Sequence, residues 1–537
     1  MKRKKILFLI LGLLITQQSF SKYEVNPFGN TMNVDTSFGM AGQNPMHNII
    51  NNGTINVRGG WGLYLTSSPS IKNNGVINVD NNGTNPNHPA IGIYARNIQG
   101  PFLTEPTIEN HGIIHVRRGT GIKALGYTTV KNVIGSSIIV NDSGIGIDLE
   151  GENKLFPTIT NNGSIIVNDS GTGIILQSHA QLKNQGTFIV NNTGKGIIVK
   201  DIASSLTNKS SIIVNDSGTG IISETNSQVT NQSTGAIIVN DSGTGISAID
   251  NSKVTNQGEI TTNHSGTGIV GQNYSTVTNA KNITVKGPST GIVGKDHAQV
   301  TNLGLIVVDR SGNGIVAQGD STVTNAGSIT VKGPSTGIIG KDHAQVTNLG
   351  LIAVDGFGIG IKSFGANIYN NGTISAPSGH AIAMSAKDEV LELGEHSKLT
   401  GITDGFDGED TLILSGNGIM NLGINSIRNF EKLVTTGNVT VKGTYNLGVS
   451  NGSGYQKSAF SPIKYSLNDA SGAKGNLIVD GTINVAVNYD GITARGTDKT
   501  GKIIANTITK TNNGHIILVN GGKTPNGIIT ELENNNK

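Results

Sequence analysis

Residues 275–309 read STVTNAKNITVKGPSTGIVGKDHAQVTNLGLIVVD, and residues 321–355 repeat them with only four of the 35 positions changed. The offset between the two stretches covers two shorter units, each of which contains a Gly-Ile pair. Self-similarity at a period of about 20 to 50 residues is typical of solenoid proteins. The stretch therefore predicts that the chain winds as a series of stacked coils.

The repeat extends well beyond this duplicated segment. Counted on the glycine of the Gly-Ile pair, ten regular copies follow one another at intervals of 23 to 27 residues, most often 23. Looser copies precede them at Gly62, Gly92 and Gly121, and Ala381 takes the glycine position in a later copy. The ten reference glycines are Gly146, Gly173, Gly196, Gly220, Gly245, Gly268, Gly291, Gly314, Gly337 and Gly360.

Apolar residues occupy fixed positions relative to these glycines. Ile stands eight residues before the glycine in nine copies, with Phe188 as the exception, and Val stands six before it in nine, with Thr262 as the exception. A spacing of two places both side chains on one face of a strand. Helical repeats would need apolar residues three and four apart and would not tolerate this much Gly, Asn and Thr.

We therefore predict an all-β fold, a right-handed parallel β-helix built as a solenoid of ~23-residue coils. Like side chains from successive coils would then stack in the interior. The residue after the reference glycine is Ile in all ten copies, and the predicted isoleucine ladder includes Ile292, Ile315, Ile338 and Ile361.

An asparagine stands twelve residues before the reference glycine in eight of the ten copies. Asn tolerates left-handed backbone at a corner, and its amide can hydrogen-bond the Asn of the next coil if it is buried. Two interpretations stay open, a buried ladder and a surface turn residue. The predicted ladder includes Asn279, Asn302, Asn325 and Asn348.

The hexapeptide NDSGTG occurs at residues 168–173, 215–220 and 240–245. Its Asp-Ser-Gly-Thr order resembles the sequence around the catalytic carboxylate of pepsin-like aspartic proteases, which need two carboxylates that share a proton. Other coils place His264 or Pro288 at the position of the aspartate. Such replacements would abolish that chemistry but suit a turn. We predict that the hexapeptide marks a corner of the rod.

The N-terminus carries the pattern of an export signal. Four basic residues at 2–5 precede an apolar run at 6–15, and Ser19 and Ser21 stand at positions −3 and −1 of a cleavage site before Lys22. This run is too short to span a bilayer, which takes about 20 residues. We expect residues 1–21 to be a signal peptide that is removed between Ser21 and Lys22.

Composition argues against several functional classes. Loss of the four basic residues at 2–5 leaves 35 Lys and Arg against 36 Asp and Glu, so we expect no nucleic-acid partner. The chain has no cysteine, which excludes disulfides and thiolate metal sites. His297 and His343 recur because their segment is duplicated, which does not indicate metal ligation. We expect no catalytic residue and no cofactor.

The segment Asp404-Gly-Phe-Asp407-Gly-Glu-Asp410 resembles a single calcium-binding nonapeptide of the toxin-repeat type. Such sites need several stacked copies to complete the oxygen shell of the ion. Asp404, Asp407 and Asp410 are therefore candidate calcium ligands, with an ordinary acidic turn as the alternative.

The repeat pattern divides the mature chain into three parts. Residues 22–45 lack the repeat and are predicted to cap the open first coil, whose edge would otherwise pair with other chains. Residues 46–385 are predicted to form the parallel β-helix. Residues 386–537 are predicted to form irregular β-helix and a β-rich C-terminal end region.

The signal peptide, the coils, the lack of cysteine and the segment IRNFEKLVTTGNVTVKGTYNLG at 427–448 together resemble the passenger domain of a Gram-negative autotransporter adhesin. In that family a comparable stretch lies in the last part of the stalk. The matching residues here are Phe430, Glu431, Lys432, Leu433, Gly437 and Asn438.

The chain departs from this family because its sequence ends at ELENNNK without a translocator barrel of roughly 250–300 residues. We therefore expect a truncated passenger, a split gene product or a secreted rod, with an outer-membrane translocator as a partner that can act in trans. The segments NPFG at 26–29 and NPMH at 44–47 hint at a two-partner secretion exoprotein as an alternative.

These observations predict a structural and adhesive rod that is displayed at the cell surface or outer membrane, or released outside the cell. Its expected partner is a surface protein or glycan of a host or of bacteria, bound by many weak contacts along the rod. The irregular insertions at 81–108 and 148–160 are candidate contact loops. A β-helical polysaccharide lyase or glycoside hydrolase is the enzymatic alternative.

Overall fold

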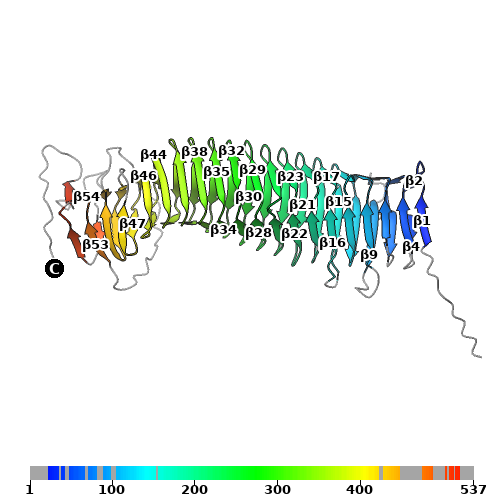
Figure 1. The fold of residues 1–537 in the computed structure, drawn as a ribbon, viewed down its shortest axis with the longest axis horizontal. Helices are drawn as coiled ribbons and strands as arrows, with labels where there is room; N and C mark the ends of the chain where they lie inside the picture. Colours follow the sequence, from blue (N-terminus) through cyan, green and yellow to red (C-terminus); the bar gives the residue numbers. More distant parts are fainter. Residues whose placement is uncertain are drawn as a thin grey trace, which may run out of the picture.

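The computed structural model describes residues 22–520, except for segments 36–37, 43–46, 67–69, 82–88, 98–104, 153–154, 422–426, 448–474, 488–501, 505–506 and 513–514. All regular structure in these residues is β, and none of it is helical. The strands stack into an elongated rod with β1 at one end and the last strands at the other (Figure 1). The predicted all-β parallel solenoid is confirmed.

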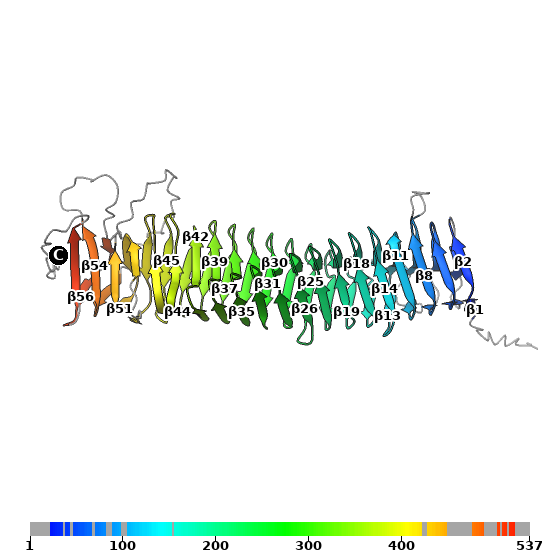
Figure 2. The ribbon, with the colours of Figure 1, turned by 90° about the horizontal axis from the view of Figure 1, so that it is seen from above.

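Each coil contributes three short strands, as the coil of β31 (Thr276–Asn279), β32 (Ile283–Lys286) and β33 (Thr290–Gly294) illustrates. Each strand pairs in parallel with its counterpart one coil away, so the strands form three series along the rod (Figure 2). The register places like on like, for example Thr278 beside Thr301. The next coil consists of β34 (Gln299–Asn302), β35 (Leu305–Asp309) and β36 (Asn313–Ala317).

Among the described residues the first strands make one sheet of 19 strands, and the second and third strands share a sheet of 34. The two series share a sheet because β44 (Thr373–Ala383) runs through both positions and pairs with both preceding strands, β41 (Leu351–Asp355) and β42 (Ile359–Phe364). Residues Thr373–Ala383 therefore form one continuous strand in that coil.

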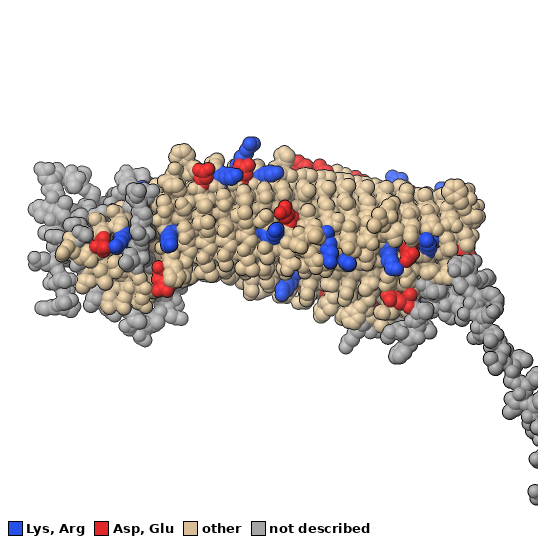
Figure 3. All heavy atoms as spheres, in the orientation of Figure 1, with Lys and Arg blue, Asp and Glu red and all other residues tan. Residues whose placement is uncertain are grey.

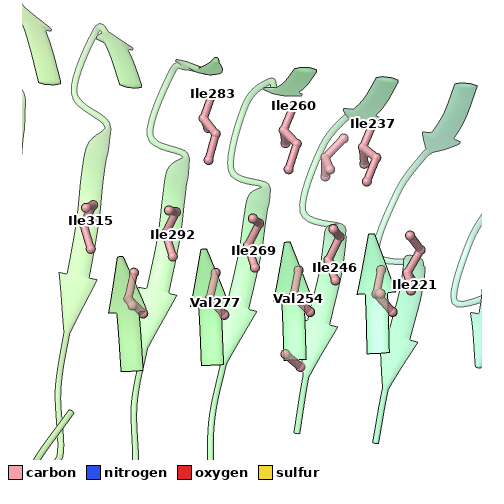
Figure 4. Close-up of a cluster of buried hydrophobic side chains, with 14 of the residues drawn as sticks. Ile221, Ile237, Ile246, Val254, Ile260, Ile269, Val277, Ile283, Ile292 and Ile315 are labelled. Atoms are coloured by element: carbon pink, nitrogen blue, oxygen red, sulfur yellow. The ribbon is translucent and has the colours of Figure 1, made fainter. Parts of the chain in front are cut away.

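The interior holds columns of aliphatic side chains that come from the inward positions of the strands. Figure 4 shows these side chains projecting inward from successive coils. Full burial of such a side chain is worth roughly 1.5–3 kcal/mol, and adjacent coils repeat the same contact. Ile292, Ile315, Ile338 and Ile361 of the predicted ladder are each 0% exposed.

A column of glycines runs beside the isoleucines because the coils approach too closely there for a side chain. A Cβ on Gly291 would lie 2.6 Å from the backbone oxygen of Gly314 in the next coil and 3.2 Å from a methyl group of Val285. The same approach recurs along the column: a Cβ on Gly268 would lie 2.6 Å from the backbone oxygen of Gly291. The repeated glycine is therefore a requirement of coil stacking.

The asparagine column forms a buried ladder of side-chain hydrogen bonds. The Nδ2 group of Asn279 donates to Oδ1 of Asn302 at 2.8 Å and to the carbonyl oxygen of Lys281 at 2.9 Å. Asn302 donates to Asn325, and Asn325 to Asn348, each at 2.8 Å. The structure therefore places these residues in the interior at the end of the first strand. The ladder runs unbroken through Asn26, Asn51, Asn73, Asn110, Asn132, Asn161, Asn184, Asn208, Asn231, Asn256, Asn279, Asn302, Asn325, Asn348 and Asn370.

The segment predicted as a non-repeating cap forms a coil of its own. Its strands β1 (Lys22–Asn26), β2 (Thr31–Val34) and β3 (Phe38–Gly42) pair in parallel with β4 (His47–Asn51), β5 (Thr54–Val57) and β6 (Trp61–Thr66). Asn26 starts the asparagine ladder by donating to Asn51 at 2.7 Å. The description of residues 22–45 as lacking the repeat is thus corrected, because they supply the first coil.

The described part of the C-terminal region continues the rod. First-series strands continue through β45 (Val390–Leu393), β47 (Thr411–Leu414), β50 (Lys432–Thr435) and β55 (Lys502–Ile504). A separate four-stranded sheet joins β48 (Gly418–Asn421), β51 (Asn438–Lys442), β53 (Asn476–Val479) and β56 (Thr507–Lys510). β46 (Lys398–Asp404) spans the second and third positions, and the third-position series continues through β49 (Ile427–Phe430), β52 (Thr444–Leu447), β54 (Thr482–Val487) and β57 (His515–Asn520). No helix in the described ranges is long and apolar enough to cross a membrane.

Candidate functional site

The NDSGTG units lie at the corner between the second and third strands. Asp169, Asp216 and Asp241 all have φ of 54°, which is left-handed backbone. The same turn position is taken by Asn192 and His264 with nearly the same φ. Asn, Asp and glycine adopt this conformation at the lowest cost, which explains why they recur here. The hexapeptide is therefore a turn sequence, as predicted.

The asparagine that precedes each of these turn residues forms a second, partly buried ladder. The Nδ2 group of Asn240 donates to Oδ1 of Asn215 at 2.8 Å, and Asn263 donates to Asn240 at 2.9 Å. The ladder continues to Asn141 through Asn191 and Asn168. In the next coil after Asn263, Lys286 takes the position, and the turn becomes Gly287-Pro288.

An open groove of about 740 Å³ lies where the turn sequence changes. Its lining includes Asp241, His264, Lys286, Asp309 and Arg310. The imidazole Nδ1 of His264 lies 3.8 Å from Oδ1 of Asp241, and both side chains are mostly exposed. Exposed pairs of this kind are weak because water screens them. The groove offers hydrogen bonds and balanced charge to a ligand, with no pair of buried carboxylates.

Charged groups are sparse on the surface as a whole. Figure 3 shows Lys, Arg, Asp and Glu as scattered spots on a mostly uncharged face of the rod. This distribution provides no continuous basic stripe on that face for a nucleic-acid backbone.

The candidate calcium ligands are not gathered around one point. Both Nε and Nη2 of Arg428 donate to the carboxylate of Asp404 at 2.7 Å, and Asn429 donates to its other oxygen. Asp410 instead accepts the backbone amide of Glu389 at 2.8 Å. No group of three or more acidic or histidine side chains within the described residues could hold a metal ion. Asp404 and Asp410 are thus both buried and engaged in contacts within the protein.

Asp410 belongs to a column of buried carboxylates that the sequence patterns did not reveal. The backbone amide of Asp410 donates to Oε2 of Glu431 at 2.6 Å, just as that of Glu389 donates to Asp410. Glu389 accepts hydrogen bonds from Oγ of Ser363 and from the backbone amide of Ser385, each at 2.5 Å. These acids join coils through backbone amides and therefore have a structural role. On β44, burial lowers the pKa of His380 below its ordinary value.

The duplicated histidines occupy the corner between the third strand and the next coil. His297 and His343 have φ of 65° and 68°, and each follows an aspartate that is also left-handed. The ring of His297 stacks on Tyr274 with the centroids 4.7 Å apart. These histidines lie at turns, where the repeat explains their recurrence.

The remaining predicted residues lie in or beside the rod. Lys22 begins β1, whereas Ser21 lies outside the described residues. Phe430 on β49 and Leu433 on β50 of the segment at 427–448 are fully buried, and Glu431 belongs to the acidic column. Parts of both predicted contact insertions, at 82–88, 98–104 and 153–154, also lie outside the described residues.

Sequence reasoning missed one aromatic cluster on the outside of the rod. Trp61 and Tyr64 on β6 stack with Tyr94 on β9 (Ile91–Asn97). The signal was available in the stretches WGLY and IGIY, where an aromatic residue stands at the same position after the reference glycine. It was overlooked because these coils lie outside the ten regular copies.

Comparison with known proteins supports the fold. A family model described as the third pectate lyase-like domain of BigA matches residues 192–338. This range covers the coils that line most of the groove. Searches of curated proteins and of solved structures found no match.

Proposed function

We propose that the chain is an exported β-helical rod that acts as a structural and adhesive module at or outside the cell surface, as an autotransporter passenger does. The observation that carries the proposal is the series of first strands, which stack in register without a break from β1 to β50. An unbroken asparagine ladder links the first 15 coils of that stack. A stiff stack presents the same turn positions at regular intervals, which suits the summing of many weak contacts.

The partner that fits this geometry is a protein or glycan on the surface of a host cell or a bacterium. The fold-level similarity to a pectate lyase-like domain is compatible with this role, because solenoid folds serve unrelated functions. Export through a signal peptide cleaved before Lys22, and transfer by an outer-membrane translocator, complete the proposal.

The groove favours one second candidate, a polysaccharide lyase or hydrolase. It lies within the matched region and contains two acidic residues, a histidine and two basic residues. Exposure of Asp241 and His264 argues against this candidate, because acid–base catalysis in these enzymes relies on carboxylates tuned by burial or proximity.

One experiment separates the two functions. We expect the full chain to adhere to at least one type of host or bacterial cell and to release no reducing or unsaturated sugars from a panel of plant, animal and bacterial polysaccharides. We expect His264→Ala to leave adhesion unchanged. Polysaccharide cleavage that His264→Ala abolishes would replace the adhesive function with the enzymatic one.

A further inference from the structure

The three rings of the aromatic cluster lie on the outer face of the third-strand series. Trp61 and Tyr64 lie on either side of the buried pair Gly62 and Leu63 on β6, and Tyr94 is the register partner of Tyr64 in the next coil. All three side chains are partly exposed, and Trp61 is the chain's only tryptophan. The cluster is therefore an aromatic surface in a chain with few aromatic residues.

The ring geometry is that of a platform. The Trp61 centroid lies 4.7 Å from the centroids of both tyrosines, which lie 5.7 Å from each other, with planes inclined by 12° to 22°. Three parallel rings in a column would separate the outer two by about 7 Å, because each step takes at least about 3.5 Å. The two tyrosines are closer than this, so the indole does not lie between them, and the three rings form one compact cluster of stacked pairs.

Polar side chains held in fixed pairs adjoin the platform. Arg96, two residues after Tyr94, donates to the carboxylate of Glu152 at 3.1 and 3.3 Å. Lys123 is the register partner of Tyr94 on the next strand, β12 (Thr120–Gly126). Its Nζ donates to Asp148 at 2.8 Å, and Gln177 donates to the other Asp148 oxygen at 2.7 Å. These pairs provide ordered hydrogen-bond groups beside the rings.

The aromatic residues are not needed for coil stacking at this position. In later coils the same outward position is taken by aliphatic residues such as Ile175 and Ile198, and those coils stack in the same register. Phe, Tyr and Trp at these positions occur only in the first coils of the rod, where Phe38 is the register partner of Trp61, and polar pairs border them, which indicates a local binding role. Three rings are too small for a stable protein interface, which buries about 800 Å² per partner.

We propose that Trp61, Tyr64 and Tyr94 stack against the apolar face of a sugar ring in an uncharged glycan, while the Arg96–Glu152 and Lys123–Asp148 pairs hydrogen-bond its hydroxyl groups. The weakly positive C–H groups of a sugar face suit the negative faces of aromatic rings. Each cation is already paired with a carboxylate, so the site has no charge to offer an acidic glycan. This inference rests on the proposed adhesive function and names a ligand class for it.

The test uses Trp61 as a reporter, since it is the only tryptophan. The full chain is titrated with cellohexaose, mannohexaose and the hexamer of N-acetylglucosamine, with hexagalacturonate as the acidic comparison. We expect at least one neutral oligosaccharide to change the emission of Trp61 saturably. Tyr94→Ala should weaken that binding at least tenfold, while Tyr369→Ala, a partly exposed tyrosine on β43 (Asn367–Asn370), should not change it.

Calorimetry of Trp61→Phe, which keeps a ring in place, should give an affinity within about threefold of the unmodified chain, and circular dichroism should show every variant folded. The proposal is overturned if no neutral oligosaccharide changes the emission, if only hexagalacturonate does, or if Tyr94→Ala binds as the unmodified chain does. Adhesion to cells that persists in Tyr94→Ala would contradict the role of the platform in adhesion and leave the adhesive function standing. Oligosaccharide binding without adhesion to any cell would contradict only the adhesive function.

Discussion

Gly291→Ala will lower the free energy of unfolding by about 3 kcal/mol, the upper range for overpacking a tight site. The added methyl group would stand 2.6 Å from the backbone oxygen of Gly314, and that oxygen belongs to a paired strand that cannot retreat without loss of register. Urea denaturation of the full chain measures the loss. Hydrogen exchange should place it in β33, β36 and the preceding strand of their series, β30 (Thr267–Gly271).

Gly418→Ala is the matched control, because a Cβ there would find its nearest neighbour 3.8 Å away. We expect this variant to stay within about 0.5 kcal/mol of the unmodified chain. Equal stability of the two variants would refute the claim that the glycine column is set by the close approach of coils. Ala381 illustrates the requirement, since the pairing of β44 with β46 shifts register beside it, on both sides of His380.

Asn279→Ala will destabilise the rod by about 2–4 kcal/mol, because it leaves buried polar groups without partners and opens a cavity. Asn256 donates to Asn279 at 2.7 Å, and Asn279 donates to Asn302, so both neighbours lose one hydrogen bond. Thermal unfolding followed by circular dichroism, together with urea denaturation, measures the effect.

The control for this variant is an asparagine ladder that faces solvent. Asn56 donates to Asn33 at 2.9 Å and accepts from Asn78 at 2.8 Å on the outer face of the second strands. Water can replace those bonds, so Asn56→Ala should cost less than about 1 kcal/mol. An equal loss in the two variants would show that burial does not determine the strength of the ladder.

The coil and its interior could be predicted because each interior position repeats one residue type at a fixed distance from the glycine. The position of Ile292 is Ile in all ten copies, and the position of Val285 is Val in nine. A spacing of two between apolar positions identifies the buried face of a strand directly. The turn role of Asp241 was equally predictable, since other coils place His or Pro there. The sequence left open whether the asparagines are buried, because both interior ladders and surface turns favour Asn.

Other features escaped sequence reasoning for physical reasons. The first coil does not follow the repeat pattern in its sequence, because KYEVN lacks the usual residues, although Asn26 already holds the ladder position. The column of Glu389, Asp410 and Glu431 could not be predicted because its three acids lie in different local sequences of irregular coils. Only the winding of the chain brings them together. The aromatic platform forms because Tyr64 and Tyr94 are register partners in neighbouring coils, although an insertion separates them in the sequence.

Disulfide cross-linking of paired cysteines tests the in-register stacking most directly, because the chain has no cysteine of its own. Thr278 and Thr301 are outward-facing register partners in neighbouring coils, at a Cα separation of about 4.8 Å, which a disulfide can span. We predict that the double variant Thr278→Cys/Thr301→Cys cross-links readily on oxidation. The pair Thr278→Cys/Thr324→Cys, two coils and about 9.6 Å apart, should stay reduced. Cross-linking of the distant pair with none in the near pair would contradict the stacked solenoid.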